Sequence, residues 1–305
     1  MPNTREENLK RQFIHYNRRL QFLREQQARL GIFVAAEVGA EIEGLEQELT
    51  KLFEKLQRFG SSTEVQMWVN ALSPKEKRYQ VALHWAEDGR KISMARIDLS
   101  ETDLRVVNLA EADLRVANLT KTNLAQANLQ GADLRVADLQ EANLHRANLA
   151  DVDLCDANLQ RVDLSEGNLQ RADLSEADGL EANLHRANLS QADLVEAHLI
   201  DANMVEADLS DADLSWANLH GAKLNRANLR GANLSGADLS GVDLREANLQ
   251  ATDLSHTTLS WAKLQGATLH EADLSAANLY ETEYDETTVW PEGFDPDFAG
   301  AILVR

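Results

Sequence analysis

The sequence has a single cysteine, Cys155, so the chain can form no internal disulfide and no cysteine-based zinc site. It contains only four prolines, and aromatic residues make up 5% of it. Residues 1–7 include no apolar segment of the kind found in signal peptides, and no apolar run approaches the roughly 18 residues that span a membrane. We therefore expect a cytoplasmic protein that does not enter a membrane.

Basic residues are scarce in the second part of the chain. Residues 92–305 contain 15 Lys and Arg against 37 Asp and Glu, residues 1–91 contain 15 against 13, and the net charge is −20. An acidic surface repels the phosphates of nucleic acids and attracts cationic partners. We expect protein partners and no direct binding of nucleic acid.

A repeat of five residues runs from residue 94 to residue 279. Every fifth residue is Leu at all but three of 38 positions, the exceptions being Met94, Gly179 and Met204. The residue two places earlier is Ala at 27 of the 38 positions, and the residue between them is mostly Asp or Asn. A period of five fits neither an α-helix nor a long β-strand.

Within each unit, Ala and Leu point inward and Asp or Asn points outward, as in three residues of a strand. The other two residues must turn the chain, always the same way, so that it winds into a coil. Positions 20 residues apart share identity, and one such column is almost all Asp while another is almost all Asn. This predicts four units per coil, although a duplication history of 20 residues would leave the same trace.

The motif A(D/N)LXX, as in Ala112-Asp113-Leu114 and Ala147-Asn148-Leu149, resembles the pentapeptide-repeat family over residues 92–289. The resemblance implies a mainly β fold, a right-handed quadrilateral β-helix. In the run Ala177-Asp178-Gly179-Leu180-Glu181 the Leu comes one place late, and we expect a local defect in that coil.

The segments on either side of the repeat have other patterns. Residues 4–59 carry two heptad seams, which predict an antiparallel coiled-coil hairpin over residues 1–60. This hairpin resembles those found ahead of other modules in bacterial signalling and conflict proteins. Residues 61–91 have apolar positions at helical spacing and are predicted to be a helical linker and N-terminal cap. Residues 290–305 contain two prolines, which suit a terminating edge, and are predicted to be the C-terminal cap.

The Asp column is a candidate acidic strip. Three roles fit it: hydrogen bonding to the backbone at the turns, mimicry of DNA phosphates, and binding of cations. Its members are Asp113, Asp133, Asp153, Asp173, Asp193, Asp213, Asp253 and Asp273.

Several apolar residues fall at outward positions and are candidate protein contacts, with incidental exposure as the alternative. They are Leu180, Val195, Ile200, Val205, Trp216 and Trp261. Three arginines in Leu-Arg-Val units are expected to be solvated charges, with contact to a partner as the alternative; they are Arg105, Arg115 and Arg135.

No set of residues typical of catalysis or metal binding is apparent in the sequence. His145 and His185 occur in identical runs with no second ligand beside either, and Cys155 falls at a corner. The sequence shows no Ser/His/Asp set, phosphate-binding Gly loop or zinc spacing. We expect no enzyme activity, no cofactor and no metal.

The sequence predicts a non-enzymatic scaffold for protein interactions. In this interpretation the hairpin associates with another coiled coil or with a second copy of the chain, and the acidic rod is a binding surface. The alternative follows from the resemblance, since some pentapeptide-repeat proteins inhibit or protect a type II topoisomerase, gyrase, by presenting a rod shaped like DNA. The net charge of the repeat region supports that alternative.

Overall fold

The computed structural model describes Tyr16 and residues 94–304. The predicted hairpin over residues 1–60, except Tyr16, which is helical, and the predicted cap over residues 61–91 lie outside the described residues. Among the residues described, no helix is long and apolar enough to cross a membrane.

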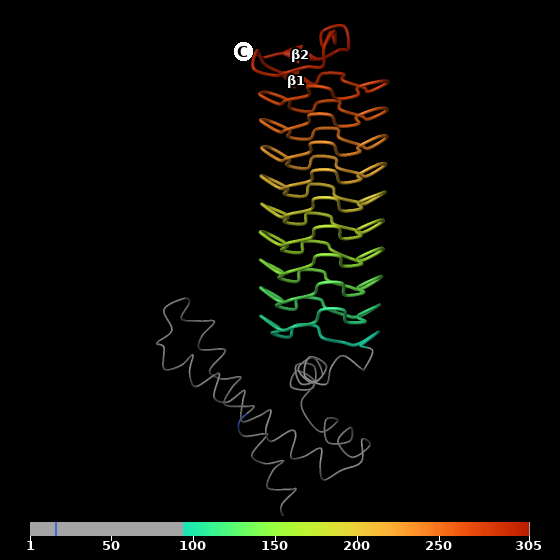
Figure 1. The fold of residues 1–305 in the computed structure, drawn as a ribbon, viewed down its shortest axis with the longest axis vertical. Coiled ribbons are helices and arrows are strands. Elements are labelled where there is room, and N and C mark those ends of the chain that lie inside the picture. Colours follow the sequence, from blue (N-terminus) through green and yellow to red (C-terminus); the bar gives the residue numbers. More distant parts are fainter. Residues whose placement is uncertain (1–15, 17–93, 305) are drawn as a thin grey trace, which may run out of the picture. The chain divides into compact units, whose positions relative to one another are not determined.

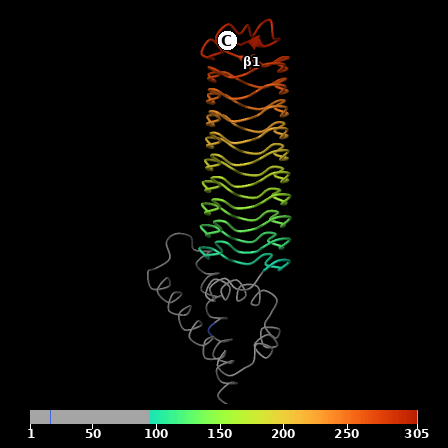
Figure 2. The same cartoon turned by 45° about the vertical axis from the view of Figure 1, so that its right-hand side comes forward.

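Residues 94–289 wind into a stack of similar coils, seen from the side in Figures 1 and 2. Parallel bridges join residues 20 apart, from Asp98 with Asn118 to Lys263 with Glu283. Each coil therefore contains four repeat units, as the spacing of the Asp and Asn columns predicts.

The rod has four faces, each with one column of outward residues at its centre. We name the third and fourth faces for their commonest residue. The central columns are Asp98–Asn278 on the first face, Asp103–Glu283 on the second, Asn108–Thr268 followed by Val289 on the Asn face, and Asp113–Asp273 on the Asp face.

The Leu column fills the interior of the rod. Every leucine of that column from Leu99 to Leu269 is at most 2% exposed, and the Ala column beside it is buried as well. Where Thr replaces Ala, its buried hydroxyl donates to a backbone carbonyl, as Thr122 Oγ1 does to Leu99 O at 2.8 Å. These leucines supply the main stabilisation, because each fully buried one contributes on the order of 1.5–3 kcal/mol.

Each corner is a four-residue turn, with a hydrogen bond such as Ala132 N to Leu129 O at 3.0 Å. Every fifth residue from Arg96 to Glu281 has a φ between +55° and +72°, as the third residue of a type II turn requires. The glycines at 231, 236 and 241 occupy this position. Most corners nevertheless use residues other than Gly, including Val136 at +59°.

The expected defect at Gly179 is absent, and that prediction was wrong. Gly179 N donates to His198 O at 2.7 Å and Glu181 N to Ile200 O at 3.0 Å, so the ladder continues without interruption. A Cβ on Gly179 would lie 2.8 Å from Leu199 Cδ2. Leu199 of the next coil thus occupies the space that a Leu at this position would fill.

The C-terminal end departs from the repeat. One extra residue is inserted after Glu283, because Thr268 pairs with Val289, 21 residues on. Two short parallel strands, β1 (Glu283–Tyr284) and β2 (Ile302–Leu303), then pair at the end of the second face. Nearby, Trp290 packs edge-on to Tyr284 at 5.4 Å between ring centroids and stacks on Phe294 at 5.2 Å.

Candidate functional site

The predicted acidic strip lies along one face, because its members are bridge partners in successive coils. Each carboxylate also accepts a hydrogen bond from the backbone N–H two residues later. Examples are Asp173 from Ser175 N at 2.9 Å and Asp193 from Val195 N at 3.0 Å. The Asp column therefore hydrogen-bonds the backbone at the turns. Whether its carboxylates also form an acidic surface depends on the charges of the neighbouring side chains.

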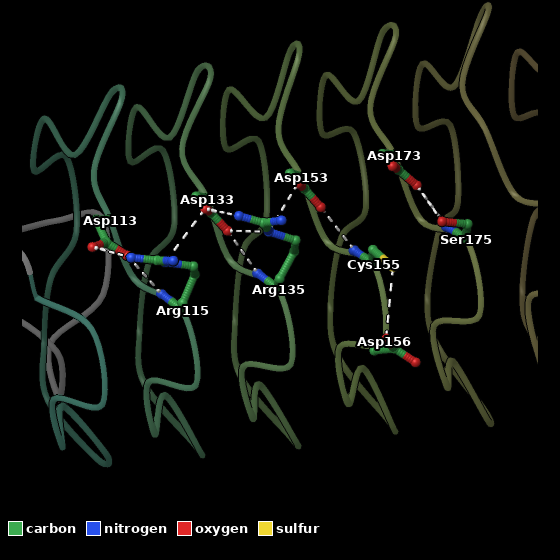
Figure 3. Close-up of polar contacts among 9 residues, drawn as sticks. All are labelled: Asp113, Arg115, Asp133, Arg135, Asp153, Cys155, Asp156, Asp173 and Ser175. Atoms are coloured by element: carbon green, nitrogen blue, oxygen red, sulfur yellow. Dashed lines mark hydrogen bonds and ion pairs between the residues drawn. The ribbon is translucent and has the colours of Figure 1, made fainter.

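Arginines partly neutralise the first coils of the Asp face (Figure 3). Arg115 Nε lies 2.8 Å from Asp113 Oδ1 and 3.6 Å from Asp133 Oδ2, and Arg135 repeats the arrangement with Asp133 at 2.7 Å and Asp153 at 3.2 Å. The Arg135 hydrogen bond lowers the pKa of Asp133. Solvated arginines were expected, and the structure instead places them in ion pairs.

Arg105 pairs in the same way with Asp103, at 2.7 Å on the second face. Each of these pairs belongs to an Asp-Leu-Arg triplet, a signal in the sequence that the prediction of solvated arginines overlooked. The triplet ending at Arg245 also forms an ion pair, of 2.6 Å, with Asp243.

Beyond Asp153 the Asp face changes character. Cys155 and Ser175 replace the arginines in the next two coils (Figure 3), and Val195 follows at the same position. The three aspartates at 173, 193 and 213 form no ion pair with any described residue. Burial, together with the neighbouring carboxylates, raises the pKa of Asp153. The three aspartates beyond it are stacked about 4.8 Å apart, so we name Asp173, Asp193 and Asp213 the acidic row.

The Asn face performs the same turn chemistry almost without charge, with Asp208 as the one carboxylate in its central column from Asn108 to Thr268. Asn128 Nδ2 donates to Asn108 Oδ1 at 2.9 Å, and Asn148, Asn168 and Asn188 continue this ladder at 2.9–3.1 Å. Each amide thus bonds the preceding coil, which a carboxylate cannot do because it has no donor. Asparagine is the more stabilising residue at this position, and within the acidic row only Asp213 takes part in such a bond, by accepting from Asn233 Nδ2 at 3.0 Å.

The edge between the second face and the Asn face is charge-balanced. Arg and Glu alternate there along six successive coils, with the three closest pairs at 2.7–2.9 Å. The residues are Arg146, Glu166, Arg186, Glu206, Arg226 and Glu246. This edge therefore offers a cationic partner much less attraction than the acidic row does.

The six candidate apolar contacts do not form one patch. Successive repeat units lie a quarter of a coil apart, so neighbouring candidates face different directions. Leu180, Ile200 and Trp261 lie on the edge between the first two faces, Val195 and Trp216 on the edge after the Asp face, and Val205 on the edge after the second face.

The four aliphatic candidates are half-buried, and only the two tryptophans are largely exposed. Trp216 lies against the next corner, since a Cβ on Gly236 would lie 2.8 Å from its Cε3. Trp261 donates to Glu281 at 2.9 Å and meets Tyr280 edge-on at 6.2 Å between ring centroids. Trp216 thus stands on the edge beside the acidic row.

The side chains of His145 and Cys155 contact neighbouring polar side chains of the rod. His145 Nδ1 lies 2.9 Å from Ser165 Oγ, and Cys155 Sγ lies 3.7 Å from Asp156 Oδ2. Within the described part of the chain, no three His, Cys, Asp or Glu side chains are grouped so that they could hold a metal ion.

The repeat geometry agrees with a comparison against known families. The profile for pentapeptide repeats matches eight copies, over residues 97–135, 137–176, 182–221, 212–250 and 252–283. The chain belongs to the pentapeptide-repeat family. Proteins of this family fold as right-handed quadrilateral β-helices and are generally non-enzymatic interaction proteins.

Solved structures of other pentapeptide-repeat proteins are similar to this chain. HetL, involved in heterocyst differentiation regulation in the cyanobacterium Nostoc sp., is 35% identical over 69% of this chain and 95% of its own, with a TM-score of 0.40. A second Nostoc protein is 40% identical over 38% of this chain and 84% of its own, with a TM-score of 0.16. QnrB1, a plasmid-mediated fluoroquinolone resistance protein, is 18% identical over 54% of this chain and 85% of its own, with a TM-score of 0.29. No curated protein matches the sequence.

Proposed function

We propose that this pentapeptide-repeat protein is a non-enzymatic scaffold whose acidic rod binds a basic surface of another protein. The observation that carries the proposal is the acidic row. Stacked carboxylates repel each other, whereas Asn at the same position makes an additional bond between coils. A row of Asp that forms no ion pair with any described residue is thus retained at the expense of stability, as residues of binding sites often are.

The filled interior of the rod supports a binding role for its outer surface. Leucines fill the interior along the whole stack, so the chemistry that the rod offers lies on its outward side chains. Trp216, 67% exposed on the edge beside the acidic row, adds an aromatic residue of the type favoured in binding hot spots. Residues 1–60 would add association with a coiled coil or a second copy, and we place the protein in the cytoplasm.

Changing the acidic row to asparagine tests this function. The triple substitution Asp173→Asn, Asp193→Asn and Asp213→Asn keeps the turn hydrogen bonds and removes three charges. We expect the folded rod to lose the proteins that wild type captures at low salt, as identified by mass spectrometry. Those captured complexes should also dissociate as salt rises, because the attraction between exposed charges is screened.

A matched control makes the same charge change elsewhere. Asp138, Asp178 and Asp238 hold the equivalent repeat position on the first face, and their change to Asn should leave capture unaltered. Equal capture by wild type and both triple variants would contradict the proposal.

The alternative function is mimicry of DNA toward gyrase, and the regular spacing of carboxylates on the Asp face favours it. A supercoiling assay with purified gyrase distinguishes the two functions. We expect no inhibition at low-micromolar concentrations of the full chain. Inhibition by wild type that disappears in the acidic-row variant would establish the alternative instead.

A further inference from the structure

The last coil of the rod is covered on only two of its four faces. Lower in the stack, each coil is bonded to the next, as Leu254 N is to Asp273 O at 2.8 Å and Leu259 N to Asn278 O at 2.8 Å. At the end of the rod, Val289 covers the Asn face, where it accepts from Leu269 N at 2.6 Å, and β2 covers the second face.

The Asp face and the first face end in an unpaired ladder. In the part of the chain that the structure describes, the N–H groups of Leu274, Ala276 and Leu279 have no acceptor. The equivalent groups one coil lower, Leu254, His256 and Leu259, are all bonded at 2.8–2.9 Å. Residues 272–279 therefore present a parallel edge whose backbone is open between residues 275 and 278, a template to which another strand can add, while the inward Leu274 and Leu279 are buried.

β2 demonstrates that this end of the rod accepts a strand. It follows the loop after β1, and Ile302 N donates to Thr282 O at 2.7 Å while Val304 N donates to Tyr284 O at 2.8 Å. In its register Leu303 pairs with Tyr284, an inward residue, yet Leu303 remains 48% exposed. Leu303 thus offers apolar surface beside the open edge, while the end of the core itself is covered, since Leu274 and Leu279 are 8% and 1% exposed.

Exposed apolar side chains gather at this end. Six of the ten large apolar side chains that are exposed in the described residues lie between Trp261 and Leu303. The most exposed of them, Phe298 at 92%, precedes Gly300, which crosses over Tyr280 with its Cβ position 3.7 Å from Tyr280 Cα. Such a concentration of apolar groups at one end is typical of a contact surface.

The charge of this end selects the chemistry of the partner. Residues 264–304 contain nine Asp and Glu and no Lys or Arg. A second copy meeting this end face to face would bring two strongly acidic surfaces together, which repulsion opposes. A basic segment matches the surface.

We infer that residues 272–279 form an end-on docking site for an extended segment of another protein. The segment adds a parallel strand to the open edge and carries a small apolar, a basic and a large apolar residue in succession. The small and large residues face the same way as Ala and Leu in the repeat, so that the large one packs against exposed apolar groups of this end such as Leu303, and the basic residue faces outward. This site is separate from the acidic row, and it extends the proposed function.

The probe is a fluorescein-labelled peptide built on two repeat units, Ala-Lys-Leu-Ser-Gly-Ala-Lys-Leu, titrated into the full chain. Two comparison peptides replace both Lys by Glu, or both Leu by Ser. We expect the Lys-Leu peptide to bind, and each comparison peptide to bind at least about tenfold more weakly, equivalent to about 1.4 kcal/mol. Absence of binding by the Lys-Leu peptide at 100 µM, a concentration on the order of weak peptide affinities, overturns the inference.

Variants of the chain locate the binding. Leu303→Ser and Asp273→Lys should each weaken binding about tenfold or more, whereas Val106→Ser, which removes an exposed apolar residue from the other end, should not. The acidic-row variant should bind as wild type does. If the acidic-row variant instead abolishes binding, the peptide recognises the Asp face and the docking site is refuted, while the proposed function stands.

Amide hydrogen exchange provides a readout that does not depend on any substitution. Bound peptide should slow exchange at Leu274 and Ala276, because their N–H groups acquire carbonyl acceptors. Binding without protection at these amides overturns strand addition. Light scattering of the full chain tests the other occupant, since a dimer that Leu303→Ser dissociates would mean that a second copy takes this end.

Discussion

At the scale of the residue, the corners carry the main conformational strain of the rod. All 38 corner positions from Arg96 to Glu281 are left-handed, and only six of them are glycine. A side chain with a Cβ is disfavoured in this region, and a β-branched one most of all. The closed stack retains these corners because each belongs to a turn bonded both within its coil and to the next coil.

Val136 provides a test of this strain. It has a φ of +59° and is 53% exposed, so Val136→Asn should relieve backbone strain while removing little buried surface. We expect the free energy of unfolding to rise by about 1 kcal/mol, measured by urea denaturation. Val195→Asn is the control, since Val195 occupies the other corner position and has no positive φ. An equal gain in both variants would show that the effect comes from surface polarity.

Individual side chains show where sequence reasoning succeeds and where it stops. The burial of Leu164 followed from its place in the period-five column, because only one path of the chain buries such a column. The regular backbone at Gly179 could not be predicted, because it depends on the side chain of Leu199, from the next coil, filling the space beside Gly179. The pairing of Arg115 with Asp133 likewise joins different coils.

At the scale of the element, the four faces of the rod were predictable from the spacing of 20 residues between like side chains. The difference in stability between the Asp column and the Asn column was not. Asp and Asn both accept the turn N–H, so the sequence alone shows two equivalent columns. The structure separates them, because Asn148 also donates to Asn128 at 2.9 Å and accepts from Asn168 at 3.1 Å. Asn233 on the Asp face makes the same kind of bond, to Asp213 at 3.0 Å.

Exchanging the two residue types should therefore have opposite effects on the two faces. Asn148→Asp loses its donor and places a carboxylate beside Asn128 Oδ1, so we expect destabilisation by about 1 kcal/mol. Asp193→Asn gains a donor toward Asp173 and removes one charge from the acidic row, so we expect stabilisation of about the same size. Thermal denaturation of both variants measures the difference. If both substitutions shifted the melting temperature in the same direction, the proposed difference in stability between the acidic row and the Asn face would be contradicted.

At the scale of the whole molecule, charge is distributed unevenly around the rod. The acidic row lies on one face, while the alternating edge from Arg146 to Glu246 is nearly neutral. Sorting the corner residues at a spacing of 20 would have revealed this alternation from the sequence. The open edge at residues 272–279 could not have been found in that way, because it depends on where Val289 and β2 return to the stack.

The alternating edge predicts how the rod responds to acid. Hydrogen bonds from Arg146, Arg186 and Arg226 lower the pKa values of Glu166, Glu206 and Glu246, respectively. A carboxyl whose pKa is lower in the folded state stabilises the fold above its unfolded pKa, near 4.3, and this contribution is lost as pH falls through the folded pKa. The pKa of Asp153 is raised, so its protonation acts in the opposite direction and favours the folded state in acid.

Replacing the three glutamates by glutamine should make the rod less stable at neutral pH and remove part of its sensitivity to acid. Urea midpoints measured at pH 7, 5, 4 and 3 should show the triple variant Glu166→Gln, Glu206→Gln and Glu246→Gln below wild type at pH 7. The two proteins should converge as the pH falls below about 4, because wild type then loses the same charges. The control is Glu176→Gln, since Glu176 holds the same corner position on another edge and forms no ion pair among the described residues. A difference between the triple variant and wild type that stays constant from pH 7 to pH 3 would mean that the edge stabilises the rod through packing of its side chains and not through charge.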